Sequence, residues 1–172
     1  MASDERDDAA RWEAVEEATE LMVEGEMASA LDRLRAVLRD DPENAYAYHY
    51  CGVALYELDQ LEPARDAFRA ATRLAPRYLA AWVALANTER LLGAPHEALR
   101  AAERALGLFP DDGDALHAAG LAAAAGGRIE LARGYLERFL ASRPELEAAL
   151  EARTILALLA KIPEGQAFSP ES

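Results

Sequence analysis

A 34-residue step is the feature that most constrains how this chain can fold. Prolines recur at that spacing as Pro42, Pro76, Pro110 and Pro144. Alanines keep the same step at Ala30, Ala64, Ala98 and Ala132. Self-similarity at a fixed period is typical of repeat proteins, in which one small structural unit is copied and stacked along the chain. We therefore predict four copies of one unit over residues 11–144.

Each unit holds two stretches of about 14 residues with apolar side chains at three- and four-residue spacing, which predicts a pair of amphipathic helices. Small residues would let the two helices approach closely, and they recur as Ala18, Gly52, Ala86 and Gly120. Turns within the units are expected near Gly25, Asp59, Gly93 and Gly127. The repeated proline cannot continue the second helix, so it predicts the turn into the next unit.

These residues resemble the tetratricopeptide repeat. The second unit matches that pattern best, through Tyr48, Gly52, Ala64, Phe68, Ala71 and Pro76. The resemblance implies an all-α fold, a right-handed α-solenoid of four tandem helix pairs with a concave face. The expected repeats span about 11–44, 45–78, 79–112 and 113–144.

The two ends of the chain do not follow the repeat. Residues 1–9 are highly charged and are expected to form a disordered acidic N-terminus ahead of a repeat domain at 10–161. Residues 145–161 predict a C-terminal capping helix, or half of a fifth repeat, with an apolar stripe of Leu146, Leu150, Leu156 and Leu159. Residues 162–172 are expected to be a flexible tail.

Charge limits the kinds of partner. The chain has 31 acidic and 18 basic residues, for a formal net charge of −13. This balance disfavours nucleic acid and anionic membrane surfaces, which require clustered Lys and Arg. The N-terminus is acidic rather than signal-like, no apolar run is long enough to span a membrane, and Cys51 is the lone cysteine. These features predict a cytoplasmic protein.

The sequence offers no convincing catalytic, metal or cofactor site. His49 and His117 occupy the same unit position two units apart, which predicts rings too distant to share a metal ion. Cys51 falls at a core position of its unit, where a small buried side chain is expected. No phosphate-binding glycine loop or nucleophile motif is present. We therefore predict a protein that is not an enzyme and has no cofactor.

The resemblance implies that the first helix of each unit lines the concave groove. The candidate peptide-binding residues on these helices are Tyr46, His49, Tyr50, Val53, Tyr56, Val83, Ala84, Asn87, Arg90, His117 and Leu121. Three of them are tyrosines within eleven residues, and tyrosine is common at binding surfaces because its ring is apolar and its tip polar. The alternative is that some of these rings pack between adjacent units.

The groove residues predict a non-enzymatic scaffold that binds another protein's peptide through apolar anchors, with basic flanks suggested by the acidic charge. The acidity could instead serve only solubility. A carboxylate clamp is disfavoured, because the corresponding positions of the first unit hold Val15 and Thr19. Two alternatives stay open. One is a chaperone of type III secretion translocators, a family the segments 117–119 and 127–132 resemble weakly; the other is a self-assembling scaffold.

Overall fold

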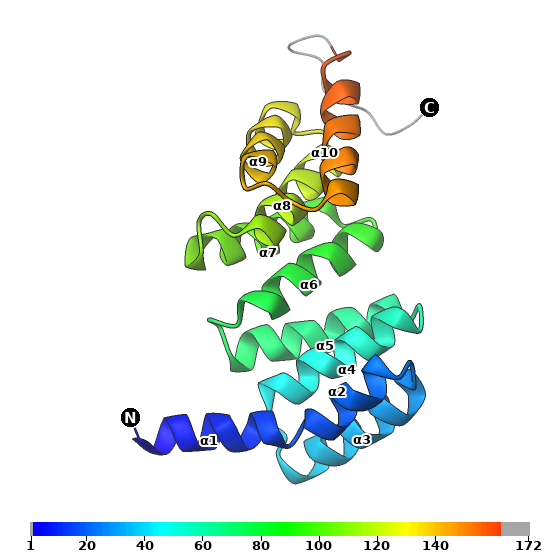
Figure 1. Ribbon diagram of the computed structural model, residues 1–172, viewed down its shortest axis with the longest axis vertical. Helices are drawn as coiled ribbons and strands as arrows, with labels where there is room; N and C mark the ends of the chain where they lie inside the picture. Colours follow the sequence, from blue (N-terminus) through cyan, green and yellow to red (C-terminus); the bar gives the residue numbers. More distant parts are fainter. Residues whose placement is uncertain (1, 163–172) are drawn as a thin grey trace. The chain divides into compact units, whose positions relative to one another are not determined.

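The computed structural model of the protein describes residues 2–162, with side chains from residue 7 onward. All regular structure in this range is helical, and Figure 1 shows the helices in chain order. The helices are α1 (Ala2–Glu13), α2 (Glu16–Val23), α3 (Met27–Asp40), α4 (Ala45–Glu57), α5 (Leu61–Leu74), α6 (Leu79–Leu91), α7 (Pro95–Leu108), α8 (Gly113–Ala125), α9 (Ile129–Ala141) and α10 (Leu146–Leu159). The predicted all-α fold of helix pairs is confirmed.

The turns inside the four helix pairs lie where the 34-residue step predicts them. Their backbone enters the left-handed region at Gly25, Asp59, Gly93 and Gly127, with φ of 83°, 57°, 74° and 70°. Glycine adopts this conformation without a steric penalty, and aspartate tolerates it better than most residues. In the second turn, the Gln60 amide donates to the Leu55 carbonyl at 2.8 Å, which caps the end of α4.

The repeated positions form the core. The repeated alanines Ala30, Ala64, Ala98 and Ala132 have no exposed surface. One turn later on the same helices lie Leu34, Phe68, Ala102 and Leu136, each at most 1% exposed. The 34-residue step is therefore a pattern of burial. The four repeated prolines follow the ends of α3, α5, α7 and α9, as predicted.

The chain contacts divide into two units. In the first, residues 1–84, α2 packs on α3, α3 on α4 and α4 on α5. In the second, residues 85–172, α7 packs on α8, α8 on α9, and α10 on α9 and α8. Contact between sequence neighbours is the expected arrangement for stacked repeats. Helix α6 begins in the first unit and ends in the second.

The N-terminal segment differs from its prediction. Residues 2–9, expected to be disordered, belong to α1, and the first repeat opens with the short α2 instead of one long helix. A two-residue turn, Ala14 and Val15, separates the two helices. The last turn of α1 accepts a hydrogen bond from Asn44, the N-cap of α4, and just beyond it Val15 and Ala18 are fully buried. Tertiary contacts of this kind are not visible in composition.

The capping helix forms, but two of the four leucines in its predicted apolar stripe are exposed. Helix α10 buries Ala149, Ala152 and Leu159 against its unit. Leu146 and Leu150 are instead 72% and 52% exposed. Small alanines allow α10 to approach its neighbours closely, and that packing sets the buried face. The predicted tail, except for Ile162, lies outside the described residues.

Candidate peptide-binding faces

The candidate face of the first unit is built on α4. The Asn44 side chain starts this helix by accepting a hydrogen bond from the Ala47 amide at 3.0 Å. From this fixed start, α4 presents four half-buried groove candidates, Tyr46, Tyr50, Val53 and Tyr56. Their spacing places Tyr46, Tyr50 and Val53 along one stripe of the helix.

The first two tyrosines of this stripe form a cluster of four rings with Trp12 and Tyr78. Trp12 of α1 meets Tyr46 edge-on with ring centroids 5.4 Å apart and lies 6.0 Å from Tyr50. On its other side, Tyr46 meets Tyr78 edge-on at 5.3 Å. Edge-to-face pairs of this kind are favourable because the positive ring edge faces the negative ring face. We call Trp12, Tyr46, Tyr50 and Tyr78 the tyrosine cluster.

His49 belongs to the core. Only 8% of it is exposed, and its ring centroid lies 4.8 Å from that of Tyr78 and 5.7 Å from that of Phe68. Burial lowers the pKa of His49 to about 4, so the ring is neutral at physiological pH. Its Nδ1 has no hydrogen-bond partner among the described residues. His49 thus supports the tyrosines from beneath.

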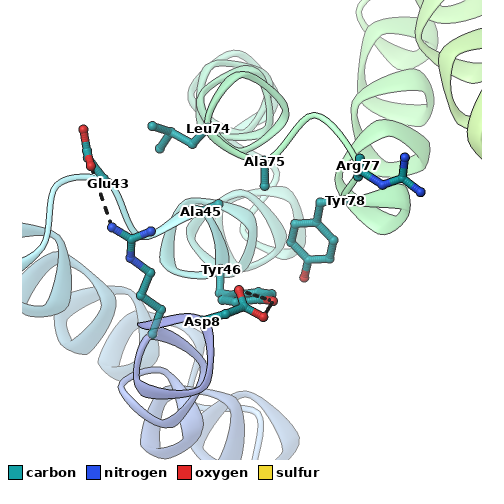
Figure 2. A pocket seen from close by; sticks show the side chains of 9 residues that line it. Asp8, Glu43, Ala45, Tyr46, Leu74, Ala75, Arg77 and Tyr78 are labelled. Atoms are coloured by element: carbon teal, nitrogen blue, oxygen red, sulfur yellow. Dashed lines mark hydrogen bonds and ion pairs between the residues drawn. The ribbon is translucent and has the colours of Figure 1, made fainter. Parts of the chain in front are cut away.

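A recess of about 380 Å³ opens beside the tyrosine cluster (Figure 2). Its apolar lining is Ala45, Leu74, Ala75 and the rings of Tyr46 and Tyr78, and its charged lining is Asp8, Arg11, Glu43 and Arg77. Figure 2 shows Tyr78 directed toward Tyr46, whereas the guanidinium of Arg77 points away. Burial raises the pKa of both phenols, so both remain protonated and can donate hydrogen bonds.

The second unit presents a different set of candidates. The ring of His117 on α8 stacks on Phe139 of α9, with centroids 4.5 Å apart. Its Nε2 lies 3.2 Å from a carboxylate oxygen of Glu151 on α10, within ion-pair range but without the alignment of a good hydrogen bond. Burial lowers the pKa of His117, and the Glu151 carboxylate opposes that shift. Part of this face is therefore taken by the chain's own capping helix.

The remaining candidates differ in accessibility. Leu121 is 8% exposed and belongs to the core of the second unit. Half-buried positions are found for Val83 and Ala84 in the first unit, and for Asn87 and Arg90 in the second.

Two contributors were missed by the sequence reasoning. Trp12 lies 34 residues before Tyr46, so the repeat step itself would have placed it at the equivalent position of the first unit. Glu151 lies on α10, outside the four repeats, and no sequence signal points to it.

The lone cysteine belongs to the core. Cys51 is 5% exposed, as its core position predicts, and burial raises the pKa of its thiol to about 11. A thiol with that pKa is a poor nucleophile at neutral pH. Among the described residues, no group of three His, Cys, Asp or Glu side chains could hold a metal ion. Val15, at a carboxylate-clamp position, is fully buried and cannot contact a peptide.

The sequence matches the tetratricopeptide repeat family in three stretches, the last two of which overlap. These cover residues 15–78, 79–121 and 114–145. Together with the helix pairs and their repeated turns, the matches show that the chain belongs to this family, as the sequence predicts. Tetratricopeptide repeats form scaffolds for protein–protein interaction.

Solved structures with the same fold are similar to this chain at low sequence identity. PilW, a type IV pilus biogenesis factor, has a TM-score of 0.75 at 22% identity, covering 88% of this chain and 72% of its own. MamA from Desulfovibrio magneticus RS-1 has a TM-score of 0.72 at 18% identity, covering 84% and 85%. YrrB, described as a TPR protein with an unusual peptide-binding site, has a TM-score of 0.65 at 22% identity, covering 83% and 82%.

One curated human relative is also similar, the Superkiller complex protein 3. It is 35% identical over 74 residues, which is 43% of this chain and 5% of the relative. The chain thus spans about a twentieth of that protein's length. Within residues 2–162, no helix is both long and apolar enough to cross a membrane.

Proposed function

We propose that this protein is a non-enzymatic scaffold that binds a segment of another protein on the first helices of its repeats. The three tyrosines of the cluster, Tyr46, Tyr50 and Tyr78, carry this proposal. Tyr46 and Tyr50 are only half-buried although the rings of Trp12, His49 and Tyr78 lie against them, so aromatic surface stays available beside a recess. Rigid rings with polar tips contribute apolar contact area and hydrogen bonds at small entropic cost, which is why tyrosine is frequent at interfaces.

The partner segment has apolar anchors in this proposal. Leu74, Ala75 and Ala45 line the recess with apolar surface that would accept an aliphatic or aromatic side chain. Basic flanks on the partner would complement the net charge of −13 and accelerate encounter at low salt.

Several other parts of the proposal rest on sequence alone. A cytoplasmic location, the absence of a cofactor and self-association of the chain all stay predictions. The same holds for the two alternatives, a type III secretion chaperone and a self-assembling scaffold. The similarity of YrrB, described as having a peptide-binding site, supports peptide capture as the mode of binding.

The test compares one variant on the candidate face of each unit with a matched tyrosine elsewhere. Affinity-tagged wild-type protein, Tyr50→Ala and Asn87→Ala are used to capture partners, which are identified by mass spectrometry. Tyr135→Ala is the control, because Tyr135 lies on α9 with its hydroxyl 3.4 Å from Glu103 and is not a groove candidate. We expect Tyr50→Ala and Asn87→Ala to lose a partner that Tyr135→Ala retains. Equal capture by all four folded proteins would contradict the proposal.

A further inference from the structure

Helix α1 lies on the face that is proposed to bind a partner. Its last turn places Trp12 against both Tyr46 and Tyr50, at centroid distances of 5.4 Å and 6.0 Å. Tyr46 also donates a hydrogen bond shared by both carboxylate oxygens of Asp8, at 2.9 Å and 3.0 Å. The chain therefore covers part of its own candidate face with a helix.

Arg11 is a third residue of α1 that contacts the first unit, at the connection between α3 and α4. The Arg11 Nε lies 2.8 Å from Asp41 Oδ2, and the Arg11 carbonyl accepts a hydrogen bond from Asn44 Nδ2 at 3.0 Å. Asp8, Arg11 and Trp12 follow each other at i, i+3 and i+4, the spacing of side chains on one helical face. This face of α1 thus carries an acid, a base and an aromatic ring, each with its own partner in the first unit.

The contacts made by the side chains of α1 are shallow. Trp12 is 42% exposed, and the side chains of Arg11 and Asp41 are 37% and 38% exposed. Ion pairs at this exposure contribute little to stability, because water and salt screen them. Figure 1 shows α1 projecting from the side of the α2–α5 helices, and among them it packs mainly on α4. A helix held in this way can be displaced by a competitor with similar contacts.

We propose that α1 is an internal occupant of a helix-binding surface formed by Asp41, Asn44, Tyr46, Tyr50 and Tyr78. This inference rests on the proposed function and specifies its partner. The partner is a helix that presents a carboxylate, an arginine three residues later and an aromatic residue four residues after the carboxylate. Its carboxylate accepts from Tyr46, its arginine pairs with Asp41, and its aromatic ring packs on Tyr46 and Tyr50. The adjoining recess leaves room for a further apolar side chain of the partner.

A labelled peptide of the chain's own residues 1–14 is the probe for this chemistry. Its binding is followed by fluorescence anisotropy against the full-length wild-type chain and the full-length double variant Asp8→Ala/Trp12→Ala. We expect the double variant to bind at least tenfold tighter, because the covalently attached α1 competes in the wild-type chain at high effective concentration. A peptide carrying the same two substitutions is the matched control and should bind neither chain.

A further variant ties binding to the named surface. Adding Tyr46→Phe to the double variant removes the hydroxyl that meets Asp8 and should weaken peptide binding about tenfold. If the double variant unfolds, hydrogen exchange on the wild-type chain replaces it: excess peptide should accelerate exchange in α1, and the substituted peptide should not.

Three results would overturn the inference. The first is equal affinity of the wild-type and double-variant chains, or no change in α1 exchange. The second is equal binding of the native and substituted peptides. The third is dimerisation of the double variant without peptide, which would assign the surface to a second copy of the chain. Partner capture that still depends on Tyr50 would leave the proposed function standing in each case.

Discussion

The ring of Phe68 on α5 lies directly against Gly52 on α4, so close that a Cβ at Gly52 would come within 2.6 Å of the ring carbon Cε1. Two repeats later, the equivalent contact is made by Gly120 on α8 and Leu136 on α9. A Cβ at Gly120 would lie 2.6 Å from Leu136 Cδ2. Both contacts join the two helices of one repeat. Each glycine thus allows the close approach on which its helix pair depends.

Replacing either of these glycines should destabilise its pair. We expect Gly52→Ala and Gly120→Ala each to lower the free energy of unfolding by about 1–3 kcal/mol, since Phe68 and Leu136 are fully packed and must shift. Urea unfolding followed by circular dichroism measures the change. Gly134→Ala on α9 is the matched control, because a Cβ there meets no atom within 4 Å. It should raise stability by about 0.5–1 kcal/mol; equal losses for all three would refute the packing argument.

The helix caps Asn44 and Asp112 occupy the same position in two repeats. We expect their replacement to lower the free energy of unfolding by different amounts. Asn44 is 1% exposed, accepts from the Ala47 amide and also donates to the Arg11 carbonyl. Asp112 only accepts from the Ala115 amide at 2.9 Å. Asn44→Ala should therefore cost about 2–3 kcal/mol and Asp112→Ala about 1 kcal/mol, as urea titrations would report. A larger loss for Asp112→Ala would contradict this ranking.

Burial of His49 predicts a pH dependence of stability. Its pKa is about 4 in the folded protein, compared with 6.5 in an unfolded chain. Between these values the unfolded state binds more protons, so stability falls as pH drops from 6.5 to 4. The contribution of His49 is fully present above pH 6.5, and its loss amounts to about 3 kcal/mol.

The variant His49→Gln isolates this contribution from that of the many carboxylates. Chemical unfolding of both proteins is measured from pH 7 to pH 4. The wild type should lose about 3 kcal/mol more than the variant over that range. Parallel curves would show that His49 is more hydrated than its contacts indicate.

The capping helix offers a test of which face is buried. Leu159 is 6% exposed, whereas Leu150 is 52% exposed. Leu159→Ala should cost about 2–4 kcal/mol, and Leu150→Ala less than about 1 kcal/mol. Thermal unfolding would separate the two cases. Equal losses of stability in the two variants would indicate that Leu150 is buried like Leu159, as the sequence suggests, and would contradict the observed packing.

Much of the fold could be predicted because the same 34-residue spacing recurs in all four repeats. The 34-residue step places the buried alanines, the four left-handed turns and the prolines that follow the second helices. Each of these depends on local backbone geometry or on packing between neighbours in sequence, which a repeated pattern records directly.

The ends of the chain and the accessibility of the candidate site depend on contacts outside the repeat. The hydrogen bond from Tyr46 to Asp8 joins residues 38 apart, and it accompanies a helix where composition suggested disorder. The position of His49 within its repeat did not reveal that Phe68 and Tyr78 enclose its ring. Periodicity assigns a residue to a helix face, but the size of its neighbours determines how much of it remains exposed.

Site-specific photo-cross-linking tests the central claim most directly. A photoreactive phenylalanine analogue replaces Val53 on the candidate face of α4 or, as the control, exposed Asp66 on α5. Both proteins are irradiated with the partner that wild-type protein captures. The account predicts a covalent adduct from position 53 and none from position 66. An adduct only from position 66 would place the partner on the second helix of the repeat and contradict the account.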